Sequence, residues 1–300
     1  MEIVEETTQP QESPWLERPL SAWISLNWVS LLFGSIIVLT VISRFYMLGV
    51  RVMSHDETSH VYFSWLLEQG RGYKHDPVTH GPLQFHLMAL SYFLFGDNDF
   101  TARLPQAIAS VLTIAFMWNY RRYLGRAGWL VAAALLLISP YMLYYGRYAR
   151  NEAFVALFGV IMLWAVMRYL ETGAPRYLYW LTASIVLHFT SKETAYIYVA
   201  QLLVFLALYF LFQVLQTTWP NPGNRNRFLI ALILAVLLLG AAGGIFLQGQ
   251  PDAPTGATDT AQPAVPGEPQ AAPMAISPTA LALGAAGLLA LIFSLFFLIR

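Results

Sequence analysis

Long apolar runs separated by short polar stretches dominate the chain. A membrane-spanning helix needs about 20 mostly apolar residues. Eight segments fit this description, at 28–48, 102–120, 127–145, 151–170, 177–190, 194–216, 228–247 and 279–299. The fifth segment is short, so the residues that follow it are expected at membrane depth inside a protein cavity. The pattern predicts an all-α polytopic membrane protein with about eight transmembrane helices.

One further apolar run, at 82–95, is too short to cross a bilayer. It follows Gly81-Pro82, a pair that suits the start of a helix, and it carries Gln84 and His86. A short apolar helix with polar positions is typical of a segment that lies in the membrane interface. We therefore expect interfacial helices in the first outer loop, 49–101, and we expect this loop to hold an active site.

The remaining segments differ in composition from the transmembrane core, which we place at 28–247. Residues 1–27 are polar and acidic, unlike a signal peptide, and are predicted to form a cytoplasmic tail. Residues 248–277 are rich in Pro, Ala, Gly, Thr and Gln without periodicity, which predicts a disordered outer linker before the last helix at 278–300. The chain stops directly after that span, so we expect it to be the front part of a longer protein.

Composition supports the membrane assignment and excludes several kinds of site. The chain is 57% hydrophobic and 11% charged, whereas soluble domains are about 25% charged. The formal net charge is zero, so nothing indicates a nucleic-acid partner. The absence of cysteine excludes disulfides, thiolate metal sites and a cysteine nucleophile.

Eight spans place both termini on one side of the membrane, and the loop charges indicate which side. Arginines concentrate in the loops on that side, which is typical of the cytoplasm: Arg121, Arg122, Arg126, Arg168, Arg176, Arg225 and Arg227. Four polar motifs then fall on the outer face, at 54–60, 76–86, 144–154 and 190–195. We expect a multi-pass protein of the cell membrane whose active site is extracytoplasmic.

The first outer motif, SHDETSH, combines a helix start with candidate chemistry. Ser54 and Glu57 form a capping-box pattern, which explains Glu57 but leaves Asp56 unexplained. Asp56 and His60 are four residues apart and share a helix face, so they could hold a metal ion together. The alternative for Asp56 is a solvated acidic turn.

The other motifs have structural readings that explain only some of their residues. In the second motif, a turn before the interfacial helix leaves His80 unexplained. In the third, Asn151 is a good N-cap and Glu152 complements a helix dipole, but outer arginines, Arg147 and Arg150, instead suit a phosphate or a buried carboxylate.

The fourth motif, Thr190-Ser191-Lys192-Glu193, again has a capping-box pattern, which would open the sixth span. The box accounts for Glu193. Lys192 lies at the end of the short span, and an ionisable residue at membrane depth is a functional candidate.

Taken in order, these motifs resemble the membrane-embedded GT-C glycosyltransferases, which include the protein O-mannosyltransferases and the lipid A aminoarabinose transferases. Asp56-Glu57 matches the acidic pair of the first outer loop, and His80-Gly81-Pro82-Leu83 resembles a His/Lys-Pro-Pro-Leu element with glycine in place of the first proline. FTARLPQA, SPYMLYYGRYARNE and FTSKE resemble later family segments. The SHDE, HGPL and RYARNE motifs most resemble the prokaryotic "flippase activity-associated" proteins. The likeness covers about 28–215, and the low-complexity 248–277 segment departs from the ordered donor-contacting loop of better-known relatives.

The resemblance implies an enzyme that moves a sugar from a polyprenyl-phosphate donor in the membrane to an acceptor, with inversion at the anomeric centre. Asp56 would be the base or would orient the acceptor, with Glu57 and Glu152 as supporting acids or metal ligands. The substrate would contact His55, His80, Arg147, Arg150, Lys192 and Glu193. Carboxylates suit Mg²⁺ or Mn²⁺ and histidines also suit Zn²⁺, so a divalent cofactor stays an open expectation.

Two other classes of protein compete with this interpretation. A lipid-linked sugar flippase or other transporter would carry polar residues through the middle of several spans, and the fourth, sixth, seventh and eighth spans have almost none. A structural membrane subunit would give no reason for titratable residues to gather on one face.

Overall fold

The computed structural model describes residues 27–73, 80–219, 221–248 and 277–299, and all of its regular elements in these ranges are helices. The predicted tail and the predicted linker lie almost entirely outside the described residues. The chain divides into two compact units, Met1–Leu208 and Tyr209–Arg300. The predicted all-α fold is confirmed.

Each of the eight predicted spans contains a helix, with ends that differ by up to seven residues. They are α2 (Trp28–Phe45), α5 (Asp99–Phe116), α6 (Arg121–Ile138), α8 (Glu152–Thr172), α9 (Arg176–Phe189), α10 (Ala195–Gln216), α11 (Pro222–Gln248) and α12 (Pro278–Ile299). Within the described residues, six segments are long and apolar enough to cross a membrane, and one of them, Asp99–Ile138, contains both α5 and α6.

Two residues explain how this part of the chain differs from the prediction. Gly125 has a φ of 71°, which separates the first residues of α6 from the rest and lets the chain turn back after α5 and the short 3-10 helix η3 (Met117–Tyr120). The loop predicted at 121–126 is therefore part of a kinked helix. The predicted span 127–145 is also interrupted, because Pro140 starts a new helix, α7 (Pro140–Tyr145).

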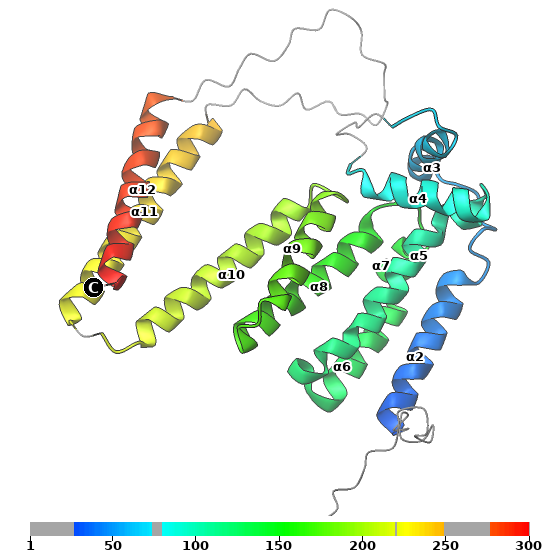
Figure 1. Ribbon diagram of the computed structural model, residues 1–300, viewed down its shortest axis with the longest axis horizontal. Coiled ribbons are helices and arrows are strands. Elements are labelled where there is room, and N and C mark those ends of the chain that lie inside the picture. Colours follow the sequence, from blue (N-terminus) through cyan, green and yellow to red (C-terminus); the bar gives the residue numbers. More distant parts are fainter. Residues whose placement is uncertain (1–26, 74–79, 220, 249–276, 300) are drawn as a thin grey trace, which may run out of the picture. The chain divides into compact units, whose positions relative to one another are not determined.

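The first unit has two short helices across one end of its long helices. These are α3 (His55–Glu68) and α4 (Leu83–Phe95), which lie where α2 ends and α5 begins (Figure 1). The capping box at the start of α3 is formed, and Gly96 ends α4 at a φ of 82°. The helix predicted at 82–95 is thus confirmed, one residue shorter.

Buried arginines join the helices of the first unit near this end. Arg44, at 0% exposure, donates to the carbonyls of Leu136 and Leu137 at the end of α6 and to the hydroxyl of Ser110 on α5. A cation at a helix C-terminus satisfies free carbonyls and complements the helix dipole. Arg44 therefore fixes the ends of α2 and α6 against α5.

The second unit contains a helical hairpin of α11 and α12. Gly287 lets the two helices approach closely, since a Cβ there would meet the Leu239 side chain at 2.7 Å. The buried hydroxyl of Ser294 donates to the carbonyl of Phe228 on the other helix. No residue of this unit is used in the site below.

Candidate active site

The polar motifs of the first unit meet at the end of the bundle that α3 and α4 cover. Two ion pairs, Asp56–Arg150 and Lys192–Glu152, and the contact between His80 and Glu193 join segments that are distant in sequence, with distances of 2.6–2.7 Å. Convergence of the four motifs on one end of the structure, which the sequence predicts, is thus observed for their described parts. Residues 76–79 of the second motif lie outside the described residues.

Glu57 is the buried centre of this end. Its carboxylate, at 0% exposure, accepts hydrogen bonds from Arg103 through both oxygens (2.8 and 3.0 Å) and from Arg51 (2.8 Å). It also accepts from the backbone N–H groups of Ser54 (3.1 Å) and Ala149 (3.0 Å). Burial acts to raise the pKa of Glu57, but these hydrogen bonds and the Arg103 charge lower it below its usual value.

The capping interpretation of Glu57 is therefore confirmed, but the capping bond to the Ser54 N–H is only one of the five hydrogen bonds that the carboxylate accepts. A carboxylate offers about four lone-pair directions, so no acceptor position of Glu57 remains for a metal or a substrate. Glu57 instead ties α3 to α5 and to the segment before α8.

Asp56 is the more accessible member of the acidic pair. Its side chain is 44% exposed, and Oδ2 accepts a 2.7 Å hydrogen bond from Arg150. Since Asp56 and Glu57 are adjacent on α3, they point in different directions. Asp56 thus presents a carboxylate at the surface of the site, oriented by one arginine, as a group that contacts substrate requires.

His60 lies one helical turn after Asp56 and is 5% exposed. Its Nδ1 is 2.9 Å from the backbone oxygen of Asp56, and because a carbonyl can only accept, Nδ1 carries the proton. Burial lowers the pKa of His60, outweighing the opposing hydrogen bond to Asp56, so the ring is neutral near pH 7 and Nε2 has a free lone pair. Nε2 is buried with no hydrogen-bond partner among the described atoms.

The predicted Asp56–His60 metal pair stays a prediction. The two residues do meet, but through the Asp56 backbone, while the carboxylate pairs with Arg150. No group of three or more metal-ligating side chains occurs in the described ranges.

The His80 segment packs against the loop that carries Lys192. His80 Nδ1 is 2.7 Å from Glu193 Oε2, and the Gly81 N–H donates to the Ser191 carbonyl at 3.1 Å. A Cβ at Gly81 would overlap the backbone of Thr190. Proline at this position would both overlap and lack the donor, which explains why glycine stands where the resembled element has its first proline.

We expect Gly81→Ala to separate these two loops. The methyl group would overlap backbone atoms, which cannot move aside as a flexible side chain can, so the thermal unfolding midpoint should fall by several degrees. Gly34→Ala on α2, where an added Cβ has open space, is the control and should leave the midpoint unchanged or slightly raised. Equal midpoints for both variants in thermal unfolding would contradict the tight contact.

Lys192 and Glu152 form a second, partly buried ion pair, less buried than Glu57–Arg103. Lys192 Nζ lies 2.6 Å from Glu152 Oε1, with side-chain exposures of 18% and 12%. The capping box predicted at 190–193 is wrong: α10 begins only at Ala195, the Thr190 hydroxyl donates back to Leu187, and Glu193 pairs with His80. Both charged residues of this loop are thus directed to the site.

The predicted N-cap role of Asn151 is also only partly right. Asn151 occupies the N-cap position of α8, but its side chain makes no capping hydrogen bond, and its backbone is already helical at φ −73°, ψ −15°. The amide is 0% exposed, and neither its nitrogen nor its oxygen has a partner among the described atoms. Helix capping therefore does not account for this side chain.

Arg147 and His55 are not brought into the cluster. Arg147 donates to the carbonyls of Ser43 (2.9 Å) and Tyr46 (2.7 Å) at the end of α2, the arrangement of a helix C-terminal cap. His55 is exposed at the first position of α3. Their predicted substrate contacts stay predictions, and the proposals below do not use them.

Sequence reasoning missed the role of Arg103 and the burial of Asn151. Arg103 is 0% exposed within α5, where it neutralises Glu57. The available signal was an arginine inside an apolar span, which requires a buried anionic partner or a run of carbonyls. Nothing in the sequence distinguishes a buried Asn151 from an ordinary N-cap.

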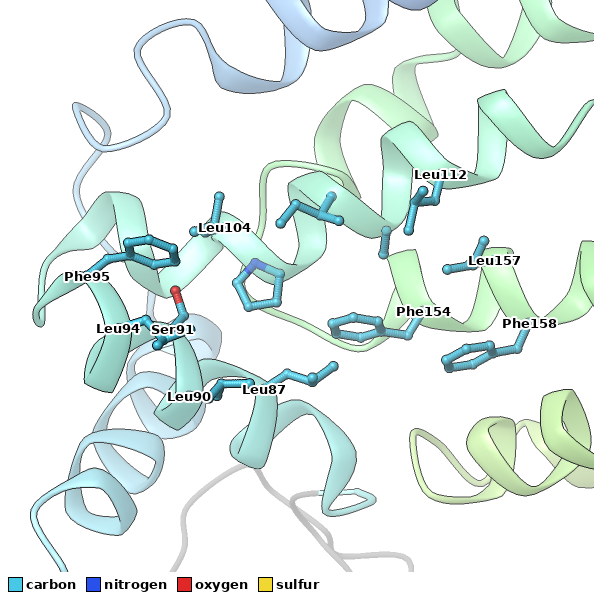
Figure 2. Close-up of a pocket in the computed structure, with 13 residues that line it drawn as sticks. Leu87, Leu90, Ser91, Leu94, Phe95, Leu104, Leu112, Phe154, Leu157 and Phe158 are labelled. Atoms are coloured by element: carbon cyan, nitrogen blue, oxygen red, sulfur yellow. The ribbon is translucent and has the colours of Figure 1, made fainter. Parts of the chain in front are cut away.

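An apolar pocket of about 310 Å³ lies among the helices of the first unit (Figure 2). It lies between α4, α5 and the first turns of α8, where Phe154 follows Glu152 by two residues. Several lining side chains are largely exposed, including Leu94 (57%), Phe95 (63%) and Leu112 (49%). The remaining lining residues are Leu87, Leu90, Ser91, Leu104, Pro105, Ile108, Ala109, Leu157 and Phe158.

Three chemical features are linked to residues 150–154, at the start of α8. The site has an accessible carboxylate at Asp56, cations at Arg150 and Lys192, and an exposed apolar pocket. Such a set can take a proton, hold an anion and accommodate an aliphatic chain.

Comparison with known families agrees with this chemistry. The model of the dolichyl-phosphate-mannose-protein mannosyltransferase family matches residues 79–251, more than half of the chain. The match contains the His80, Arg150, Glu152 and Lys192 motifs, while Asp56 and Glu57 precede it and contact it through Arg150 and Ala149. No curated protein and no solved structure matches the chain. The chain therefore belongs to the dolichyl-phosphate-mannose-protein mannosyltransferase family, whose members are membrane glycosyltransferases that use a lipid-linked sugar.

Proposed function

We propose that this protein transfers a sugar from a polyprenyl phosphate to an acceptor hydroxyl at the extracytoplasmic surface of the cell membrane. One observation carries the proposal: the exposed apolar pocket is lined by Phe154, which follows Glu152 of the Lys192–Glu152 pair by two residues on α8. A polyprenyl phosphate has the matching chemistry, an apolar chain joined directly to an anion. The outer location is supported by loop arginines of the first unit at the opposite end of its helices, among them Arg122 and Arg168.

In this proposal Asp56 is the general base. It takes the proton of the acceptor hydroxyl as the acceptor oxygen attacks the anomeric carbon. The bond between that carbon and the phosphate oxygen breaks, and the electron pair leaves with the phosphate. Direct displacement inverts the anomeric centre. Arg150 orients Asp56 before the reaction, and Arg150 and Lys192 stabilise the negative charge on the departing lipid phosphate.

Lys192→Met should weaken binding of polyprenyl phosphate by roughly tenfold or more, because it removes a partly buried cation whose hydrogen bonds to phosphate are charge-assisted. Lys192→Arg, which keeps the charge, should restore much of the affinity. Binding of a short-chain polyprenyl phosphate to the full chain in detergent can be followed by thermal stabilisation, since a ligand of the folded state raises the midpoint.

Arg122→Met provides the matched control, because it removes a cation from an ion pair with Glu171 at the other end of the bundle. It should leave lipid binding unchanged. Equal affinity of wild type and Lys192→Met for the lipid would contradict the assignment of this end of the bundle to the donor phosphate.

A further inference from the structure

Several buried polar atoms at the start of α8, and one on α3, have no hydrogen-bond partner in the described part of the chain. They are His60 Nε2, Arg150 Nε, both polar atoms of the Asn151 amide and Glu152 Oε2. Buried polar groups in folded proteins are almost always paired, because an unpaired one keeps the cost of leaving water. Other buried side chains also have unpaired polar atoms, at Gln84, Tyr92, Gln106, His188 and Thr194, but only residues 150–152 form a consecutive run among those in the described part of the chain.

A closed circuit of contacts and chain neighbours joins the residues that carry these atoms. Starting from α3, the His60 ring stacks on the His80 ring at 6.4 Å, and His80 pairs with Glu193. Lys192, next to Glu193, pairs with Glu152. On the other side, Arg150 pairs with Asp56, whose backbone carbonyl binds His60. Asn151 lies between the two halves of this circuit, at 0% exposure.

The chemistry of the unpaired atoms distinguishes between possible ligands. Arg150 Nε and the Asn151 nitrogen are donors, whereas Glu152 Oε2, His60 Nε2 and the Asn151 oxygen are acceptors. A phosphate ester without a proton can only accept, so it would leave the three acceptors unpaired. A hydroxyl group both donates and accepts, and a pyranose carries several in a fixed arrangement.

We infer that the atoms around Asn151 form a subsite for the hydroxyl groups of the transferred sugar. This inference rests on the proposed function, since it assigns the sugar of the same lipid-linked donor. The Asn151 amide, which can donate and accept at once, is the central positioning group, and His60 Nε2 accepts from a neighbouring hydroxyl. The phosphate then contacts Lys192 and the outer nitrogens of Arg150, and the prenyl chain lies in the pocket of Figure 2.

The test compares a short-chain polyprenyl phosphate with its mannosyl and glucosyl esters as ligands of the full chain. Wild type should bind at least one sugar ester more tightly than the bare lipid phosphate. Asn151→Ala should lower affinity for that ester by about tenfold while leaving affinity for the bare phosphate within twofold, because it removes hydrogen bonds to the sugar alone. The thermal midpoint without ligand should be unchanged or higher, since an unpaired amide is removed.

Asn119→Ala is the control, an equivalent change in η3 at the opposite end of α5 that should alter neither affinity. Four results would overturn the sugar subsite. They are equal losses for ester and bare phosphate, no loss for either, no preference of wild type for an ester over bare phosphate, and failure of Asn151→Ala to fold where Asn119→Ala folds. None of these four results contradicts the proposed function, provided that wild type binds the bare polyprenyl phosphate. If wild type binds none of the three lipids, the proposed function fails, and the subsite with it.

Discussion

Glu57→Gln should destabilise the protein by about 3–5 kcal/mol, the usual result of removing one member of a buried ion pair. Glutamine has the right size and retains one acceptor, but it replaces an anion with an amide nitrogen that faces the Arg103 donors. Arg103, at 0% exposure, would then be a buried cation without its counter-ion. The thermal or denaturant unfolding of the purified full chain measures the effect.

A double-mutant cycle separates the ion pair from a local packing effect. Glu57→Gln combined with Arg103→Met should cost clearly less than the sum of the two single changes, because the second change removes the uncompensated charge. Additive costs would show that the two residues act independently. That result would contradict the role of Glu57 as the anchor between α3 and α5.

Acid should reduce the stability that the ionised Glu57 carboxylate contributes. The pKa of Glu57 is lowered from its usual 4.5, chiefly by hydrogen bonds from Arg103 and the backbone against the opposing effect of burial. The stability that this ionisation supplies is therefore fully present above pH 4.5 and is lost as pH falls toward the lower folded-state pKa. The difference in stability between wild type and Glu57→Gln should narrow in that acidic range.

Asp56→Asn should reduce sugar transfer by two or more orders of magnitude, about the usual contribution of a general base. Asparagine has nearly the same shape but cannot take the acceptor proton. Stability should change little, because the side chain is 44% exposed and its single ion pair with Arg150 is at the surface. Transfer is measured in vesicles that carry the full chain and native acceptors, supplied with a radiolabelled polyprenyl-phosphate sugar.

Glu171→Gln is the matched control, an acid-to-amide change in an arginine-paired carboxylate at the opposite end of the bundle. It should leave transfer unchanged. Near-normal transfer by a folded Asp56→Asn protein would remove Asp56 from the chemistry. A large loss of stability alongside lost transfer would instead indicate a structural role.

The helices could be predicted from the sequence because their signals are local. Each of the eight apolar runs contains a helix, and the capping box at Ser54 and the turn before Leu83 lie where the patterns indicate. The prediction failed where one residue changes the direction of the chain. Gly125 kinks α6 and Pro140 starts α7, and periodicity alone cannot tell such positions from ordinary loop ends.

The site could be predicted only in part, because its pairings are not local. The sequence indicates that titratable residues gather at one end, and ion pairs and ring contacts in the structure join Asp56, His60, His80, Arg150, Glu152, Lys192 and Glu193. It could not show that Glu57 pairs with Arg103, 46 residues away, or that Glu193 pairs with His80 rather than capping α10. Partners of this kind depend on how the helices pack, which spacing along the chain does not determine.

The most direct test of the central claim follows a radiolabelled polyprenyl-phosphate sugar on the outer side of sealed vesicles, with and without the full-length wild-type chain. The proposal predicts that the label leaves the lipid only when the chain is present and appears on an acceptor at the outer face. Label that remains on the lipid while crossing to the inner leaflet would instead indicate a flippase. Label that stays on the lipid at the outer face, although the acceptors are present, would contradict the assignment of sugar transfer to this protein.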